Sequence, residues 1–251
     1  MDDVLNKASG RTLRIEVCFS PVMYSAFHNP EAIVVVTDVL RASSAIVTAL
    51  MNGAQSVIPV ETIQEAKDLK SKGFLVAAER DGIKLDFADL GNSPFNFTVE
   101  KISGKQIVYS TTNGTQAIHM AREAHRVIVG AFINLSATCR YLTGMGCDII
   151  ILCAGWKNRF SLEDTVHAGA IVEKVLQDQR YSTICDSALA ALDLWKLAKP
   201  DIRGYLEKCA QRSRLRKNKL DDVIDYCFTP DLTEVIPVFQ EGQLVDIHRK
   251  S

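Results

Sequence analysis

Residues 33–61 read IVVVTDVLRASSAIVTALMNGAQSVIPVE, which is the pattern of a strand, a helix and a second strand. The run at 33–37 is apolar or β-branched, and the segment after it has apolar side chains at 42, 45, 46, 49 and 50. Gly53 stands where a left-handed helix cap is expected, and residues 56–60 are again rich in Val and Ile. This alternation of strand and helix patterns is typical of a chain built from βαβ units, with a mainly parallel sheet.

The alternation of strand and helix patterns continues on both sides of this unit. Short runs rich in Val and Ile predict further strands at residues 15–19, 74–78, 106–110, 126–130 and 148–153. Helical patterns are expected at residues 41–52, 62–72, 115–124, 136–142 and 161–176. Several strands are apolar at consecutive positions, so both faces of the sheet are expected to be covered. The chain is therefore predicted to have an α/β fold with a mainly parallel or mixed sheet.

The pattern changes in the last third of the chain. Residues 186–227 predict one helix after another, and the basic stretch 212–219 within them is interpreted as a solvated face. Residues 235–239 and 244–247 predict a terminal β-hairpin. Pro237 lacks a backbone N–H, so the hairpin is expected at an edge of the sheet.

Bulk properties exclude some classes of function. The 251 residues contain 29 Lys and Arg against 30 Asp and Glu, which gives no electrostatic reason to expect nucleic acid or an anionic membrane as partner. No apolar run approaches the roughly 20 residues that span a bilayer, and the seven cysteines form no CxxC pair. A cytoplasmic protein with reduced thiols is expected. Residues 1–251 are predicted to form one domain, with a subdivision near 130–185 as the alternative.

Acidic residues follow two strongly apolar strands. Asp38 and Glu79 come directly after the predicted strands, and ligands of open α/β sheets collect at that edge. Carboxylate oxygen is the donor that hard cations prefer, so both are candidate metal ligands. Arg41 and Ser43 add a guanidinium and a hydroxyl at the start of the following helix. The alternative is that Asp38 only caps this helix and pairs with Arg41.

A hydroxyl-rich turn follows a third strand. Residues 110–115 read STTNGT, and they offer Thr111, Thr112, Asn113, Gly114 and Thr115 to a phosphoryl group. Glycine lets backbone amides approach a ligand, and a helix N-terminus favours anions. The turn lacks the GxxxxGK[ST] pattern and no GxGxxG occurs in the chain, so nucleotide binding is unsupported. An ordinary capped turn is the alternative.

The stretch CAGWKNRFSLED at 153–164 is the richest in functional groups. Glu163 and Asp164 could ligate a metal or transfer protons, although Ser161 and Asp164 also form an N-capping pattern. Cys153 and Arg159 have the spacing of a cysteine-nucleophile phosphatase. That spacing alone is weak evidence, and the bulky Trp156 and Lys157 between them disfavour a tight anion loop.

Taken in order, five segments resemble the 2-phosphosulfolactate phosphatase family, and the likeness covers nearly the whole chain. The segments are DVLRASS at 38–44, AER at 78–80, DLGNSP at 89–94, TTNGT at 111–115 and the stretch at 153–164. The resemblance implies a magnesium-dependent hydrolase that converts 2-phospho-3-sulfolactate to sulfolactate and orthophosphate, in a route toward coenzyme M. It also implies a three-layer α/β/α fold.

These considerations give a hypothesis for the site. Mg²⁺ is expected on Asp38, Glu79 and Asp164, while Asp38, Glu163 and Arg159 are the expected catalytic residues, with Glu163 transferring a proton to the leaving hydroxyl. The expected binding residues for the phosphoryl group are Arg41, Ser43, Thr111, Thr112, Asn113, Gly114 and Thr115. Ser161 and Arg159 are placed near the sulfonate or carboxylate end. The attacking oxygen stays open between water and a carboxylate.

Three alternatives accompany this hypothesis. An aspartyl-phosphate route through Asp38 is disfavoured, because the haloacid-dehalogenase pattern has a second Asp where Leu40 stands. A cysteine mechanism through Cys153 and Arg159 is the second. A non-enzymatic module that binds an anionic metabolite is the third. The expected partner is a small phosphorylated, sulfonated acid, with a homodimer as one candidate assembly.

Overall fold

Eleven strands form one mixed sheet in the computed structural model, which describes residues 11–249. Their order across the sheet is β5-β4-β6-β3-β11-β10-β7-β2-β8-β1-β9. The strands are β1 (Leu13–Cys18), β2 (Ile33–Thr37), β3 (Ser56–Pro59), β4 (Leu75–Arg80), β5 (Ile83–Lys84), β6 (Gln106–Ser110), β7 (Arg126–Gly130), β8 (Ile149–Cys153), β9 (Tyr181–Ser182), β10 (Pro237–Gln240) and β11 (Gln243–Asp246). All seven strands expected in the first two thirds of the chain are present, each within two residues of the predicted ends.

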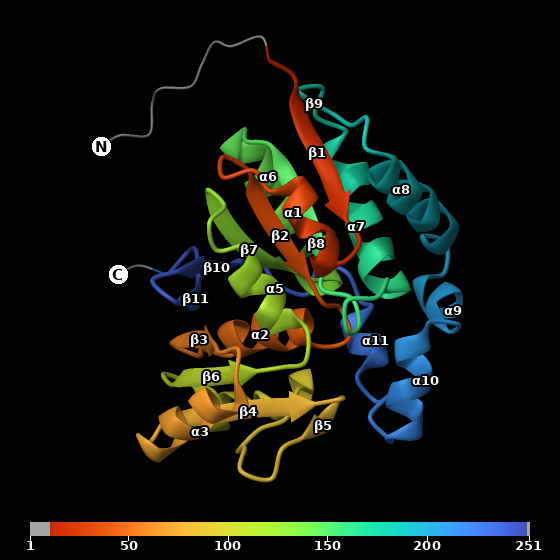
Figure 1. Ribbon diagram of the computed structural model, residues 1–251. Helices are drawn as coiled ribbons and strands as arrows, with labels where there is room; N and C mark the ends of the chain where they lie inside the picture. Colours follow the sequence, from red (N-terminus) through yellow and green to blue (C-terminus); the bar gives the residue numbers. More distant parts are fainter. Residues whose placement is uncertain (1–10, 250–251) are drawn as a thin grey trace.

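Helices cover both faces of this sheet, which makes a three-layer α/β/α fold (Figure 1). The α-helices are α1 (Tyr24–Phe27), α2 (Ala42–Met51), α3 (Ile63–Ser71), α4 (Val99–Ile102), α5 (Gly114–Met120), α6 (Leu135–Met145), α7 (Leu162–Val175), α8 (Asp186–Ala198), α9 (Ile202–Leu206), α10 (Ala210–Lys217) and α11 (Ile224–Cys227). Short 3₁₀ turns lie at η1 (Pro21–Met23), η2 (Pro94–Asn96) and η3 (Phe132–Asn134). None of the described helices has the length and apolar character needed to cross a bilayer.

The terminal hairpin is present, but its predicted place at a sheet edge is wrong. Strands β10 and β11 lie in the middle of the sheet, where β10 pairs with β7 and β11 pairs with β3. Pro237 is tolerated because it is the first residue of its strand. Asn134 anchors the hairpin, since its side-chain amide donates to the carbonyl of Val235 (3.0 Å). The hairpin therefore joins two parallel groups of strands into one sheet.

The two parallel groups are β4-β6-β3 and β7-β2-β8-β1-β9. Three antiparallel pairings separate them, so in a flat sheet their carboxyl ends would lie at opposite edges. Sheets twist instead, and the twist accumulates over successive strands. In Figure 1 the second group descends steeply while β4 and β6 run across the picture. The carboxyl ends of β2 and β6 consequently come together.

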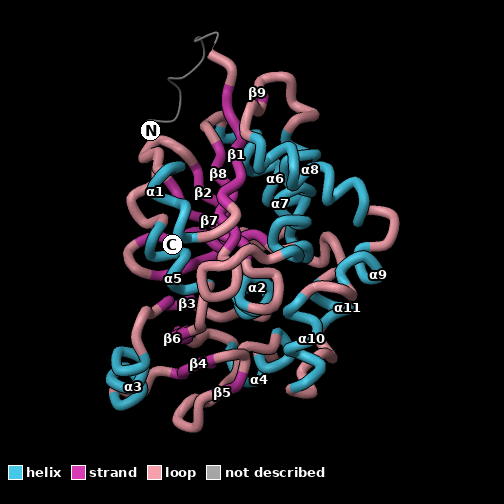
Figure 2. Tube along the Cα trace, turned by 45° about the vertical axis from the view of Figure 1, so that its right-hand side comes forward, coloured by secondary structure: helices cyan, strands magenta, loops and turns pink. Residues whose placement is uncertain are grey.

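Helix α2 lies between the two groups of strands (Figure 2). Every residue from Ala42 to Leu50 is buried, so this helix is covered all round rather than on one face. Its side chains belong to a core cluster that contains Val34 and Val36 of β2 as well as Ile107 and Tyr109 of β6. The central helix thus links both groups of strands, and its first residue stands next to Asp38.

Candidate active site

Asp38 stands at the carboxyl end of β2, in a turn held by backbone and hydroxyl contacts. The Asp38 N–H donates to Ser43 Oγ (2.8 Å), and the Ser43 N–H donates back to the Asp38 carbonyl (2.8 Å). Ser44 Oγ donates to the Val39 carbonyl (3.0 Å). The Ser43 oxygen, predicted to bind phosphate, therefore serves to fix the main chain of the turn. Asp38 itself accepts a long hydrogen bond from the Ala42 N–H (3.4 Å).

Asp164 ties the first turn of α7 to the carboxyl ends of β2 and β8. Its Oδ1 accepts the Val39 N–H (2.9 Å) just past β2, and its Oδ2 accepts the Gly155 N–H (3.1 Å) just past β8. Ser161 is the N-cap residue, since its Oγ accepts the Asp164 N–H (3.3 Å). The predicted capping pattern is confirmed. The Ser161 side chain also shares a hydrogen bond with Glu163, and its predicted substrate role stays a prediction.

Glu79 lies within β4, not after it, and its carboxylate holds two loops. Oε1 accepts the Thr112 N–H (2.7 Å) and Oε2 accepts the Gly82 N–H (2.5 Å). Thr112 Oγ1 in turn accepts the Asp81 N–H (3.1 Å). The turn after β6 is therefore fixed to the β4–β5 hairpin through Glu79.

The rest of the turn after β6 is fixed by its own side chains and by a close approach to Asp38. Thr111 Oγ1 accepts the Thr115 N–H (3.3 Å), and Thr115 Oγ1 accepts the Thr111 N–H (3.4 Å). A Cβ on Gly114 would lie 2.8 Å from Ala42 Cβ and 3.0 Å from Asp38 Oδ2. Real Cβ atoms are not found this near to other carbon atoms, so only glycine lets this turn lie against Asp38.

Buried carboxyl groups gather around Asp38. Burial raises the pKa of Asp38 to about 7, and the charges of Glu79 and Glu163 add to the rise, while the Ala42 N–H and Arg41 oppose it. Burial also raises the pKa of Asp164 well above its ordinary value, with Glu163 and Asp38 as further causes. The pKa of Glu163 is raised by burial too. Carboxyl groups perturbed in this way favour protons or a bound cation over free charge.

The carboxylate oxygens of this cluster are the donors that a hard cation prefers, but they are not arranged as a metal-ligand shell. Among residues 11–249, no three His, Cys, Asp or Glu side chains are arranged to hold a metal ion. Glu79 and Asp164 each use both carboxylate oxygens on backbone N–H groups, as described above. Asp38 has the most capacity left, and oxygen is the donor that Mg²⁺ prefers. The donor types thus suit Mg²⁺, with Asp38 as the first residue to hold it.

The loop between β8 and α7 lies against the other turns. Residues 156–159 form a tight reversal in which Trp156 and Arg159 exchange two backbone hydrogen bonds of 3.0 Å. Lys157 and Asn158 have positive φ angles of 49° and 62°, and a Cβ on Gly155 would lie 2.3 Å from the Arg159 carbonyl oxygen. The Lys157 N–H donates to Asn113 Oδ1 (2.8 Å), and its Nζ pairs with Asp81 (2.6 Å). This loop joins the second group of strands to the first.

Arg159 does not reach the carboxylates. Its side chain is exposed, and the described contacts of the residue are the backbone bonds to Trp156. Cys153 is completely buried, and burial raises the pKa of its thiol well above the ordinary 9.0. A cysteine nucleophile needs a depressed pKa and an arginine beside it, so the structure opposes the cysteine mechanism.

The sequence interpretation missed Arg214. It lies in the basic stretch predicted to be a solvated face, yet its guanidinium stacks on the Trp156 ring, 4.2 Å from the centroid. Its charge also lowers the pKa of Glu163, which shares a hydrogen bond with the Cys209 thiol. Spacing gives no sign of this arrangement, because α10 is distant in sequence from the loop that it covers.

Arg41 and the 89–94 segment have roles other than metal binding. The Arg41 guanidinium is buried and donates from Nη2 to the Gly82 carbonyl (2.9 Å), which ties it to the β4–β5 turn. Asp89 pairs with Lys70 and accepts the Val76 N–H (2.9 Å). Asn92 accepts a hydrogen bond from the Tyr109 hydroxyl.

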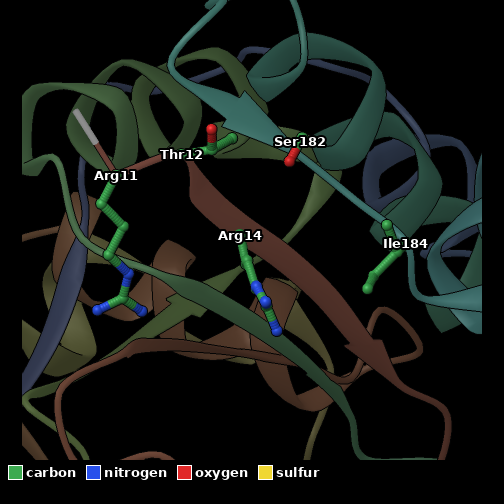
Figure 3. Close-up of a pocket in the computed structure, with 5 residues that line it drawn as sticks. All are labelled: Arg11, Thr12, Arg14, Ser182 and Ile184. Carbon is green, nitrogen blue, oxygen red and sulfur yellow. The ribbon is translucent and has the colours of Figure 1, made fainter.

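A separate cavity of about 580 Å³ lies at the opposite end of the strands (Figure 3). Arg11, Arg14 and Ser182 line it, at the amino end of β1 and beside β9. Arg11 there pairs with Asp148 (2.5 Å). Because Asp38 follows the carboxyl end of β2, and β2 is parallel to the strands around this cavity, the cavity is not part of the carboxylate site.

Comparison with known proteins gives consistent matches along the chain. The model of the family described as 2-phosphosulpholactate phosphatase matches residues 19–242. A Thermotoga maritima protein named "probable 2-phosphosulfolactate phosphatase" is 42% identical over 211 residues, which is 84% of this chain and 90% of the relative. A Clostridium botulinum protein of the same name is 30% identical over 239 residues, 94% of this chain and 100% of the relative.

Proposed function

Because the chain belongs to the 2-phosphosulpholactate phosphatase family, and is thus a phosphoric monoester hydrolase, we propose that its substrate is 2-phospho-3-sulfolactate or a closely related phosphorylated hydroxy acid. The products are the hydroxy acid and orthophosphate. The observation that carries the proposal is the contact between the turn after β6 and Asp38, with three further carboxyl groups around them. A phosphoryl group and a cation can meet there.

The phosphoryl group binds at the turn after β6. Asn113 Oδ1 is used by the Lys157 N–H, so the side-chain NH₂ of Asn113 is the end left to donate to phosphoryl oxygens. Glu79 and Thr112 keep the turn in place, and Gly114 brings it against Asp38. Placing the group in this way is a large part of catalysis, because phosphoryl transfer depends on positioning and charge stabilisation.

Glu163 supplies the proton for the leaving group. Burial raises the pKa of Glu163, which keeps a larger share of it protonated near neutral pH than an exposed glutamate would be. As the attacking oxygen, from water or from a carboxylate, bonds to phosphorus, the bond between phosphorus and the bridging oxygen breaks, and the bridging oxygen takes the proton from Glu163 and becomes the hydroxyl of the product. Arg214 limits the rise in pKa, so Glu163 can still release its proton to the leaving oxygen.

Asp38 would hold Mg²⁺ first, and Asp164 and Glu79 would join it only by giving up or sharing their bonds to backbone N–H groups. Bound there, Mg²⁺ supplies positive charge that offsets the phosphoryl oxygens and allows the buried carboxyl groups to ionise. The expected three-carboxylate set is kept as part of the proposal, with Asp38 as the essential member.

Phosphate release from 2-phospho-3-sulfolactate by the purified chain tests this proposal. We expect release with Mg²⁺, a loss of at least a hundredfold in excess EDTA, and recovery when Mg²⁺ is restored. Asp38→Asn should lower turnover by a similar factor, and Asp193→Asn, an exposed carboxylate on α8, is the matched control. Release that survives EDTA but stops after thiol alkylation would support the cysteine mechanism instead. Binding without release from any phosphorylated hydroxy acid would indicate a non-enzymatic module.

A further inference from the structure

A second cavity, of about 420 Å³, lies beside the carboxylate site and is not used by the roles assigned above. The residues that line it include Arg41, Gly82, Asn92, Asn96 and Lys219. Gly82 connects the cavity to the carboxylate site, because its N–H donates to Glu79 and its carbonyl accepts from Arg41. The cavity is therefore adjacent to the turn that receives the phosphoryl group.

The charge of this cavity favours an anion. Three cationic side chains line it, from Arg41, Lys84 and Lys219, against the single carboxylate of Asp222. Arg41 is only 2% exposed, and among residues 11–249 no carboxylate oxygen lies within 4.0 Å of its guanidinium, although the charges of Glu79 and Asp222 act on it from farther away. A buried guanidinium without a paired anion is an unfavourable arrangement unless a ligand supplies the charge.

The amide side chains are oriented as hydrogen-bond donors. Asn96 Oδ1 accepts the Gly91 N–H (3.1 Å), and Asn92 Oδ1 accepts the Tyr109 hydroxyl. Since each amide oxygen is already used by the protein, each NH₂ group is the end left for a ligand. The cavity thus combines the buried guanidinium of Arg41 with the NH₂ groups of Asn92 and Asn96, which suits a ligand group with several acceptor oxygens.

We propose that this cavity binds the sulfonate end of the substrate. The proposal rests on the function proposed above. In 2-phospho-3-sulfolactate the carboxylate and the phosphate share one carbon, while the sulfonate is on the next carbon and reaches farther from Asp38. A sulfonate has three equivalent oxygens and stays ionised, which matches donors that approach from several sides. The sequence-based hypothesis placed Arg159 and Ser161 near the sulfonate. In this proposal the sulfonate is bound instead by Arg41, Asn92, Asn96 and Lys219.

Two substitutions test the subsite by changing the selectivity of the enzyme. Lys219→Gln removes the charge at the mouth of the cavity, and Asn96→Asp keeps the oxygen that accepts the Gly91 N–H but turns the donor into a carboxylate. The measured quantity is kcat/KM for 2-phospho-3-sulfolactate divided by kcat/KM for 2-phospholactate, which lacks the sulfonate. We expect the ratio to fall roughly threefold or more for Lys219→Gln and tenfold or more for Asn96→Asp. Lys217→Gln, the same charge change on an exposed residue outside the cavity, leaves the ratio unchanged.

Calorimetry with 3-sulfolactate separates this proposal from the proposed function. Weaker binding to the Lys219→Gln and Asn96→Asp proteins than to wild type supports the subsite, even if no substrate is hydrolysed. If the wild-type protein hydrolyses both substrates and neither variant changes the ratio, the subsite is refuted and the function stands. If there is no turnover and sulfolactate binding is the same in all variants, both are refuted. Thermal melting curves show that each variant is folded.

Discussion

Asp38 carries a large electrostatic penalty in the site. The rise of its pKa from 3.8 to about 7 corresponds to roughly 4 kcal/mol of disfavoured ionisation. Burial and the charges of Glu79 and Glu163 produce the rise, and no cation in contact with Asp38 is described to relieve it. Proteins keep such penalties where a charge is needed for function. Asp38 therefore links the stability of the fold to the chemistry of the site.

This penalty gives a pH-dependent prediction for Asp38→Asn. Between about pH 4 and pH 7 the folded state holds a proton at Asp38 that the unfolded state has released, so the stability of the wild-type protein falls as pH rises through that window. Asparagine cannot ionise, and its oxygen still accepts the Ala42 N–H. In urea unfolding with EDTA present, we expect the variant to be about 1–4 kcal/mol more stable than wild type at pH 8, with the difference vanishing near pH 4.

Asp193→Asn is the control, because Asp193 is largely exposed and its loss should change stability by less than about 0.5 kcal/mol at either pH. A wild-type protein that is as stable as Asp38→Asn at pH 8 would show that Asp38 is not electrostatically strained.

The contact between Gly114 and Asp38 gives a second prediction at the residue scale. In Gly114→Ala the new Cβ meets Ala42 and Asp38, so the turn after β6 must move away. We expect a stability loss of about 1–3 kcal/mol and a fall in kcat/KM of roughly tenfold or more, because the phosphoryl group is displaced from Asp38. Gly144→Ala on α6, where a Cβ meets nothing within 4 Å, should leave activity unchanged. Equal activity in the two variants would contradict the proposed site.

At the scale of elements, α10 closes over the loop between β8 and α7. Arg214 stacks on Trp156 and opposes the rise in the Glu163 pKa. In Arg214→Gln the pKa of Glu163 should therefore rise further, so the descending alkaline limb of the kcat profile shifts to higher pH. Arg216→Gln on the same helix is the matched control, since Arg216 pairs with Glu207 instead. Identical pH profiles for the two variants would mean that Glu163 is not the proton donor.

The elements themselves were largely predictable from the sequence, and the roles of several side chains were not. Strand ends and caps are local signals, which explains why β2, β6 and the capping pattern at Ser161 were predicted well. The environment of a side chain depends on distant segments. Arg159 was expected in the site but is exposed, while Arg214 was expected in solvent but lies on Trp156. Spacing along the chain could not distinguish these two arginines.

At the scale of the whole molecule, the angle between the two groups of strands creates the site. The sequence predicted that polar residues at strand ends would meet, and Asp38 and Gly114 do so. They meet because the two groups of strands cross steeply around α2, and the periodicity of the sequence does not reveal that crossing. The sequence also could not predict that the terminal hairpin lies in the middle of the sheet. The alternation of apolar and polar residues is the same in a hairpin at an edge and in one between other strands.

Leu244 tests whether the hairpin makes the two groups one cooperative unit. It is fully buried, and it pairs with Val57 where β11 meets β3. Leu244→Ala should lower the free energy of unfolding by about 2–5 kcal/mol. If residues 1–251 fold as one domain, hydrogen exchange of the slowest amides in β2 and in β6 should show the same loss of protection. The partly exposed Leu189 on α8 provides the control, as Leu189→Ala should reduce protection by less than about 1 kcal/mol in either strand. Loss confined to β6 would divide the chain into two folding units at the hairpin, and Asp38 and Gly114 would then lie on separate units.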